Sequence, residues 1–280
     1  MKDFRDKVAV ITGAASGIGR AIAERCAQEG MYIVLADVEK EALAQAEEEI
    51  KAEGANVLAV LTDVSKASDI QALAQRALDA FGAVHLLFNN AGVTAGRTIW
   101  ESSPADWEWV MGVNLWGVIH GVRVFVPIML EQSAECHIVN TASMAGLISG
   151  PGIGIYRLTK HGVVALSETL YHELQDIDAR IKVSVLCPGF VNTRIVESER
   201  NRPAEFQNDL ANAESGPEYE AEAEGYRRAV QAGSHPSQIA DQVFRAIREE
   251  KFYILTHPEF KSAIKQRMED ILLERNPTNL

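Results

Sequence analysis

Short apolar runs alternate along this chain with longer stretches in which apolar residues recur every three or four positions. The short runs predict strands buried on both faces, and the longer stretches predict amphipathic helices. This alternation is typical of α/β folds in which helices cover both sides of a parallel sheet. The predicted strands are residues 7–12, 31–37, 56–63, 84–90, 136–142, 181–187 and 252–256. The predicted helices are residues 17–29, 39–53, 66–81, 104–132, 154–176 and 236–250.

No repeat, low-complexity tract or linker divides the chain, so we expect one catalytic domain over residues 1–280. The segment 193–234 is polar and acidic and has no strand pattern, and we interpret it as a substrate lid inserted into the domain. Residues 257–280 form a predicted C-terminal helical extension that docks on its own subunit or on a neighbour. Its apolar face is formed by Phe260, Ile264, Met268, Ile271 and Leu272.

Composition and charge narrow the classes of partner. The chain is 47% hydrophobic and 24% charged, which suffices for a large core and argues against whole-chain disorder. Its formal net charge of −12 repels polyanions, so we expect neither a nucleic acid nor an anionic membrane as partner. A small-molecule substrate fits this composition better.

Cysteine usage and hydropathy indicate a cytoplasmic protein. Cys26, Cys136 and Cys187 show neither a C-x-x-C pair nor metal-ligand spacing, so we predict no metal site and a reducing environment. The first six residues have no apolar signal core. The longest apolar stretch, residues 113–130, is interrupted by Asn114, His120, Arg123 and Pro127, and we therefore predict no membrane span.

A glycine-rich turn joins the first predicted strand to the first helix. The segment Gly13-Ala14-Ala15-Ser16-Gly17-Ile18-Gly19 has the spacing G-x-x-x-G-x-G. Glycines allow a tight turn and let the backbone approach a pyrophosphate, whose charge is favourable at a helix N-terminus. A turn with no ligand is the alternative, but the position at the first strand–helix junction favours dinucleotide binding.

The second predicted strand ends at Asp37, eighteen residues beyond Gly19. A carboxylate there can accept hydrogen bonds from the adenosine ribose hydroxyls and would repel a 2′-phosphate. Residues 31–38 contain no Lys or Arg, and Ser16 rather than a basic residue precedes Gly17. We therefore predict NAD(H) in preference to NADP(H); without the glycine turn, Asp37 would be an ordinary strand-end carboxylate.

Two further strand ends carry candidate cofactor contacts. Asp63 and Val64 follow the third strand and can hold the adenine edge, although an Asp before a helix also acts as an N-cap. Asn89, Asn90, Ala91 and Gly92 end the fourth strand. Their amides can brace neighbouring strands while the small residues leave room for a cofactor; a plain turn is the alternative.

A third group of residues carries the candidate chemistry. Ser143 follows the fifth strand, and Tyr156 and Lys160 lie four positions apart, hence on one face of a helix. A nearby ammonium favours the phenolate and lowers the pKa of a tyrosine, which would let Tyr156 shuttle a proton. Ser143 would hydrogen-bond the same substrate oxygen. Asn114 would anchor a water that relays protons to Lys160, or would only kink its helix.

Together these motifs resemble the short-chain dehydrogenase/reductase family, closely over residues 5–194 and loosely over 236–256. The resemblance implies a Rossmann-type, doubly wound sheet of seven strands in the order 3-2-1-4-5-6-7, and a homo-oligomer, dimer or tetramer. It implies Asn114, Ser143, Tyr156 and Lys160 as catalytic residues, with Lys160 also on the nicotinamide ribose. Pro188, Gly189, Val191 and Thr193 would lie at the carboxamide end of the cofactor. Arg157 departs from the family, which usually has a small residue there, and we expect it to face solvent or a subunit contact.

The resemblance predicts an oxidoreductase that moves a hydride between NAD(H) and a secondary alcohol or ketone. A cofactor-binding scaffold with an unused site and an NADPH-dependent oxoacyl-type reductase are the alternatives. Loops at the strand ends are mostly apolar and favour a hydrophobic cyclic or aromatic substrate. These apolar residues are Met144, Leu147, Ile148, Ile153, Phe190, Val191, Ile195 and Val196, and a core position for half of them is the alternative. Arg97, Arg194 and Arg200 offer sites for an anion.

Overall fold

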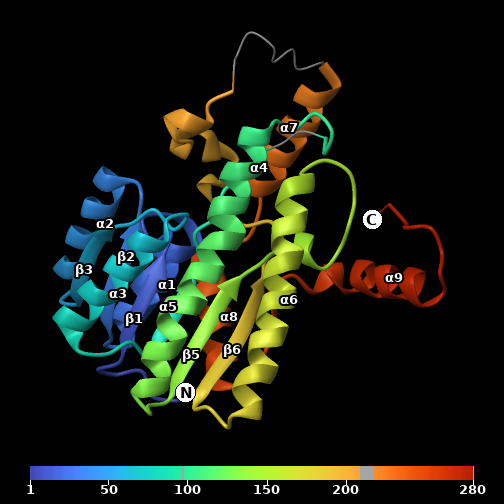
Figure 1. Ribbon diagram of the computed structural model, residues 1–280. Helices are drawn as coiled ribbons and strands as arrows, with labels where there is room; N and C mark the ends of the chain where they lie inside the picture. Colours follow the sequence, from blue (N-terminus) through green and yellow to red (C-terminus); the bar gives the residue numbers. More distant parts are fainter. Residues whose placement is uncertain (96–97, 209–216, 280) are drawn as a thin grey trace.

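Seven parallel strands form one sheet in the order β3-β2-β1-β4-β5-β6-β7 (Figure 1). The structure, a computed structural model, describes residues 1–95, 98–208 and 217–279. The predicted fold class and strand order are confirmed, and the strand bounds differ by at most two residues at each end. The strands are β1 Val8–Thr12, β2 Tyr32–Asp37, β3 Asn56–Leu61, β4 Leu86–Asn89, β5 Cys136–Thr141, β6 Ile181–Cys187 and β7 Tyr253–Leu255.

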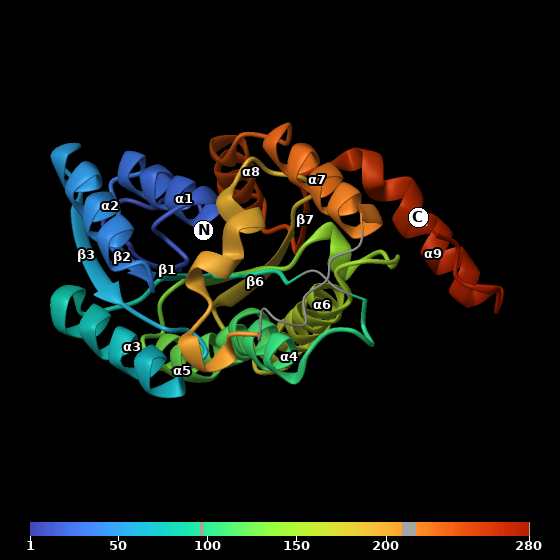
Figure 2. The ribbon, with the colours of Figure 1, turned by 90° about the horizontal axis from the view of Figure 1, so that it is seen from above.

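Helices cover both faces of the sheet (Figure 2). One layer contains α1 (Gly17–Gln28), α2 (Lys40–Ala52) and α8 (Pro236–Arg248); the other contains α3 (Ala67–Phe81), α5 (Gly117–Glu131) and α6 (Gly154–Asp176). Strand β1 is buried throughout because its alternate residues enter different cores. Ala9 and Ile11 pack with α1 and α8, whereas Val8 and Val10 pack with α3 and α5.

The helix expected over residues 104–132 is interrupted by a π-helical turn. It consists of α4 (Pro104–Met111), η1 (Gly112–Trp116) and α5, and begins with a capping box between Ser103 and Asp106. Length and composition alone would let this helix cross a membrane. Core helices have the same properties, and Phe125 and Met129 of α5 lie in the core.

Residues 193–208 and 217–234 lie above the carboxyl ends of the strands (Figure 1). They form the short helices η3 (Arg194–Asn201) and η4 (Ala204–Phe206) and the longer helix α7 (Pro217–Gln231). After β7 the chain forms η6 (Pro258–Phe260) and α9 (Lys261–Leu272), which projects away from the sheet (Figure 2). Phe260 and Ile264 pack on the core, whereas Ile271 and Leu272 are 56% and 79% exposed.

Candidate active site

The glycine-rich turn between β1 and α1 needs glycine for two reasons. Gly13 and Gly17 have φ values of +66° and +56°, in the left-handed region that favours glycine. A Cβ on Gly19 would lie 2.1 Å from the Gly13 carbonyl oxygen. The backbone therefore folds tightly at the N-terminus of α1, where helix amides can meet a phosphate.

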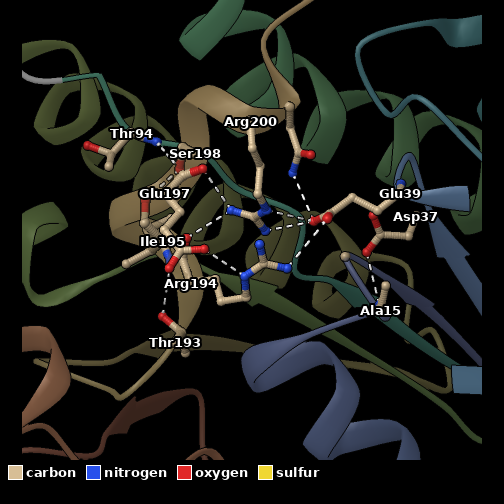
Figure 3. A network of polar contacts seen from close by, with 12 residues as sticks. Ala15, Asp37, Glu39, Thr94, Thr193, Arg194, Ile195, Glu197, Ser198 and Arg200 are labelled. Carbon is tan, nitrogen blue, oxygen red and sulfur yellow. Dashed lines mark hydrogen bonds and ion pairs between the residues drawn. The ribbon is translucent and has the colours of Figure 1, made fainter. Parts of the chain in front are cut away.

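Asp37 is hydrogen-bonded to this turn. Its Oδ2 accepts a hydrogen bond from the Ala15 amide at 2.9 Å, and its Oδ1 accepts one from the Glu39 amide at 3.0 Å (Figure 3). Burial raises the pKa of the Asp37 carboxyl, and the two amide hydrogen bonds oppose that shift. The end of β2 and the glycine turn consequently share one corner of the sheet.

The amides after β4 brace neighbouring strands. Asn90 Nδ2 donates to the Thr12 carbonyl at 3.0 Å, and Asn89 Nδ2 donates to Asn140 Oδ1 at 2.9 Å. These bonds fix the turn that leads into Ala91 and Gly92. Asp63 forms a turn of its own, because its Oδ1 accepts from the Ser65 amide and hydroxyl at 3.1 and 2.6 Å. Asp63 is not the N-cap of α3, because Lys66 occupies that position, and Asp63 borders the cavity described below.

The four predicted catalytic residues come together from three segments of chain. Tyr156 and Lys160 lie on α6, and Lys160 Nζ is 5.4 Å from the centre of the Tyr156 ring. Ser143 follows β5; its hydroxyl donates to the Pro188 carbonyl at 3.4 Å and lies close enough to the Tyr156 hydroxyl to lower the pKa of Tyr156. A Cβ on Gly92 would lie 3.5 Å from both Lys160 Nζ and Asn114 Oδ1, so Asn114 borders the same space.

Asn114 is fully buried within the π-helical turn η1. Its Oδ1 accepts from the Val93 amide and its Nδ2 donates to the Val93 carbonyl, both at 2.8 Å. The Asn114 side chain therefore forms hydrogen bonds with the segment that follows β4. A role in a water relay is open to the second lone pair of Oδ1 and to the Asn114 main chain.

Burial dominates the electrostatics of the catalytic pair. It raises the pKa of Tyr156, and the neighbouring Ser143 hydroxyl opposes this shift only in part. In this structure, burial outweighs the lowering of the Tyr156 pKa that is expected from Lys160. Burial lowers the pKa of Lys160 itself to about 8, and its ammonium donates to the Thr141 carbonyl at 2.8 Å.

A cavity of about 1410 Å³ connects the glycine turn with the catalytic residues. At one end it is bordered by Gly13, Asp37 and Asp63, and at the other by Tyr156 and Lys160. The remaining predicted cofactor contacts also line it, except Gly19, which packs beneath the turn. These are Ser16, Gly17, Ile18, Val64, Asn90, Ala91, Gly92, Pro188, Gly189, Val191 and Thr193.

This arrangement fits a dinucleotide such as NAD. The glycine turn leaves no room for a Cβ at Gly19, Asp37 offers carboxylate oxygens beside the turn, and the catalytic side chains lie at the far end of the same cavity. The sequence profile described as short chain dehydrogenase matches residues 7–204. The chain belongs to the short-chain dehydrogenase family.

Similar proteins cover nearly the whole chain. A crystal structure of a short chain dehydrogenase/reductase from Burkholderia phymatum in complex with NAD is 53% identical, with a TM-score of 0.96 over 100% of this chain and 99% of that one. The CLA biosynthesis dehydrogenase/reductase of Lactiplantibacillus plantarum is 38% identical over 99% of this chain and 97% of its own. The 1-deoxy-11-beta-hydroxypentalenate dehydrogenase of Streptomyces avermitilis is 34% identical over 96% and 91%.

The substrate end of this short-chain dehydrogenase is apolar, as the loop composition predicts. Met144, Ile148, Ile153, Phe190, Val191, Ile195 and Val196 line the cavity. Leu147 is not among the lining residues and packs instead on the core cluster that contains Val163 and Val185. Leu147 therefore has the core role that was the alternative for half of these residues.

Arg157 is a correction to the sequence prediction. It was expected to face solvent or a subunit contact, but it is half-buried and lines the cavity beside Tyr156. The loop that precedes α6 holds its guanidinium, because Nη1 donates to the Ile148 carbonyl at 3.3 Å.

The arginines proposed for an anion have carboxylate partners. Arg200 Nη2 lies 2.6 Å from Glu39 Oε1, and Arg194 Nη1 lies 3.6 Å from Glu39 Oε2 (Figure 3). These pairs bring η3 to the end of the cavity that contains Gly13 and Asp37, where the adenosine of NAD is expected (the adenosine end). The sequence does not reveal this contact. Arg97 lies outside the described residues.

Two further positioning residues were missed. His257 holds the turn after β6, since its Nδ1 accepts from the Gly189 amide at 3.0 Å and its Nε2 lies 3.0 Å from the Phe190 carbonyl oxygen. Arg202 forms a buried ion pair with Asp106 at 2.8 Å, with side chains 2% and 5% exposed. No local pattern marks either residue, because each acts on a partner far away in the sequence.

Proposed function

We propose that this short-chain dehydrogenase transfers a hydride between NAD(H) and the carbinol or carbonyl carbon of a secondary alcohol or ketone. One observation carries the proposal. Ser143, Tyr156 and Lys160 meet at one end of a cavity whose other end contains the glycine turn and Asp37. A protein that only bound the cofactor would not require those three side chains together.

In the oxidative direction the substrate alcohol loses a proton and a hydride. When bound, NAD supplies the acceptor for the hydride. Ser143 hydrogen-bonds the substrate oxygen, and the Tyr156 oxygen takes its proton. The Lys160 ammonium, buried next to Tyr156, stabilises the negative charge that develops there and is itself held by the Thr141 carbonyl. In reduction Tyr156 returns the proton to the new alkoxide.

Asp37 and the relatives support NAD as the preferred cofactor. The Asp37 carboxylate stands where the adenosine ribose is expected, and the B. phymatum neighbour was crystallised with NAD. An apolar substrate end supports a hydrophobic cyclic or aromatic substrate. The S. avermitilis relative is named for an acid that also carries a hydroxyl group, which is consistent with a carbinol substrate.

The proposal is tested by following NADH absorbance with a panel of secondary alcohols and NAD, and of ketones and NADH. Turnover that is lost in Tyr156→Phe supports it. NADH binding without turnover of any alcohol or ketone would instead favour a scaffold with an unused site.

We further propose that residues 193–234 serve as the substrate lid of a single catalytic domain. Arg200 and Arg202 tie its first part to Glu39 and Asp106, and Tyr226 of α7 packs edge-on against Phe190 at 6.1 Å. These contacts support the proposal, because a segment held in this way would exclude water during hydride transfer.

The remaining expectations are a cytoplasmic enzyme and a homo-oligomer, dimer or tetramer. The exposed apolar residues of α9 support the second of these, because such residues favour contact with another chain. Light scattering after size-exclusion chromatography measures the oligomeric state directly.

A further inference from the structure

The Arg157 guanidinium lies in the substrate half of the cavity with few partners of its own. Its Nη1 makes one hydrogen bond, to the Ile148 carbonyl at 3.3 Å. Its Nε is buried, and no hydrogen-bond partner is found for it within residues 1–95, 98–208 and 217–279, with the side chains of residues 217–220 and 222 set aside. Among the same side chains no carboxylate forms an ion pair with Arg157, whereas Arg194, Arg200 and Arg202 all have one.

Tyr226 provides a second polar group in the same place. It comes from α7, lines the cavity, and is held edge-on against Phe190. The hydroxyl lies close enough to Arg157 for the guanidinium to lower the pKa of Tyr226, although burial dominates and raises it. Tyr226 also acts electrostatically on Tyr156, so the three side chains surround one region.

Apolar side chains line the cavity that this pair shares. Met144, Ile148, Ile153 and Phe206 line the same cavity. A cation in such surroundings is stabilised most by an anion that binds with direct hydrogen bonds, and a guanidinium presents parallel N–H groups that match a carboxylate. The Arg157 guanidinium can therefore be paired by an anionic group of a ligand.

We propose that Arg157 and Tyr226 bind a carboxylate of the substrate. On this basis, the enzyme acts on hydroxy acids or keto acids whose body is apolar. The inference rests on the proposed function, because Tyr156, the neighbour of Arg157 on α6, receives the carbinol of the same molecule. A guanidinium fork and a phenolic O–H would thus orient the carbinol towards Tyr156 and Ser143.

The test compares each acid with its own methyl ester, so that only the charge and its hydrogen bonds change. Suitable pairs are 4-acetylbenzoate with methyl 4-acetylbenzoate, and 6-oxoheptanoate with its methyl ester, each reduced with NADH. We expect the wild type to have a kcat/KM for the better acid that exceeds that for its ester by roughly ten- to hundredfold.

Three variants assign the preference to the pair. Arg157→Met should abolish the preference for the acid and leave the ester rate within about twofold, and Tyr226→Phe should reduce it in part. Arg228→Met is the matched control, because Arg228 lies on α7 near Tyr226 but its side chain is 71% exposed. It should leave both rates unchanged.

A binding measurement is independent of turnover. Calorimetric titration of benzoate into the NADH complex should detect binding to the wild type and to Arg228→Met, and none to Arg157→Met. If benzoate binds to the wild type but not to Arg157→Met, and no ketone is turned over, the carboxylate site is supported and the proposed function fails.

Two results would overturn the carboxylate site at Arg157 and Tyr226 and leave the proposed function intact. One is a wild type that reduces ketones but treats acid and ester alike. The other is an Arg157→Met variant that slows acid and ester equally, which would show that Arg157 only supports the loop at Ile148.

Discussion

The Glu39 carboxylate accepts hydrogen bonds from Nε and Nη2 of Arg200 at 3.1 and 2.6 Å, between residues 161 positions apart in the sequence (Figure 3). Asn201 Nδ2 adds a third bond to the same oxygen at 3.1 Å. Arg200 also donates to the carbonyls of Arg194 and Glu197, which stiffens η3. Glu39 therefore ties η3 to the loop that follows Asp37, across the adenosine end of the cavity.

Loss of the ion pair between Glu39 and Arg200 should increase the rate at which the cofactor dissociates. Glu39→Gln keeps the shape of the side chain but removes its charge, so we expect NADH to dissociate about two- to fivefold faster, within the range of partly exposed ion pairs. Stopped-flow fluorescence of bound NADH measures this rate. Glu41→Gln is the control, because Glu41 is exposed on the first turn of α2. An unchanged rate in Glu39→Gln would show that η3 does not retain the cofactor.

Tyr156→Phe removes the proton shuttle and keeps the ring. We expect kcat to fall by roughly 10² to 10⁴, since general acid–base catalysis contributes about that much. NADH affinity should stay within a few-fold, which fluorescence titration checks in the same preparation. Near-normal turnover would refute the assignment of Tyr156.

Lys160 should contribute to activity at a cost in stability. Burial lowers its pKa from 10.5 to about 8, so the charged form is disfavoured in the folded protein by up to about 3 kcal/mol. Lys160→Met should therefore be inactive but more stable at pH 7.

The pH dependence gives the sign of this effect. The unfolded chain binds more protons between pH 8 and 10.5, so wild-type stability rises there relative to Lys160→Met. The advantage of the variant should be largest below pH 8 and shrink towards pH 10.5. Thermal unfolding of both proteins across this range measures it, and a variant less stable at every pH would contradict the argument.

The buried ion pair between Arg202 and Asp106 anchors the lid segment to α4. Arg202→Met leaves the Asp106 carboxylate buried without its cation, which typically costs about 3–5 kcal/mol. We expect faster amide hydrogen exchange in residues 193–208, measured by mass spectrometry, with the sheet unaffected. Arg227→Met is a suitable control, since Arg227 pairs with Glu224 on the surface. Equal protection in wild type and Arg202→Met would mean that other contacts fix the lid.

The sheet could be predicted from the sequence because its determinants are local. Residues 8–12 are all apolar or nearly so, and their composition alone predicts burial. The glycines at positions 13 and 17 indicate the left-handed conformation of the turn. The order of the strands required the resemblance to a family. The catalytic residues Tyr156 and Lys160 could be paired by their helical spacing alone.

The missed features depend on contacts across the fold. The sequence suggests solvent or a subunit contact for Arg157, because nothing in it shows that the Arg157 guanidinium hydrogen-bonds the loop at Ile148. Arg200 was read as an anion site because its partner, Glu39, lies in a different part of the chain. The pKa of Tyr156 depends on burial, which neighbouring charges in the sequence do not reveal.

Cofactor choice rests on Asp37. With NADP a 2′-phosphate would meet its carboxylate in a partly buried corner, so the loss of a charged hydrogen bond and the added repulsion should favour NAD in kcat/KM by at least roughly tenfold to a hundredfold. Asp37→Ser should shrink this gap, and the further change Val38→Arg should narrow it again by offering the phosphate a bidentate partner. Equal efficiency of the wild type with both cofactors would overturn the role of Asp37.

The contact between Glu39 and Arg200 extends this prediction. In the wild type Glu39 neutralises Arg200, so a cation close to the adenosine end is not free to pair with a phosphate. Adding Glu39→Gln to Asp37→Ser removes both carboxylates and releases Arg200. We therefore expect the double variant to use NADP about three- to tenfold better than Asp37→Ser alone, whereas Glu39→Gln alone should improve NADP use little because Asp37 still repels the phosphate. Steady-state kinetics of the four proteins with both cofactors measures this coupling. Simple additivity of the two changes would mean that Arg200 does not reach the 2′-phosphate.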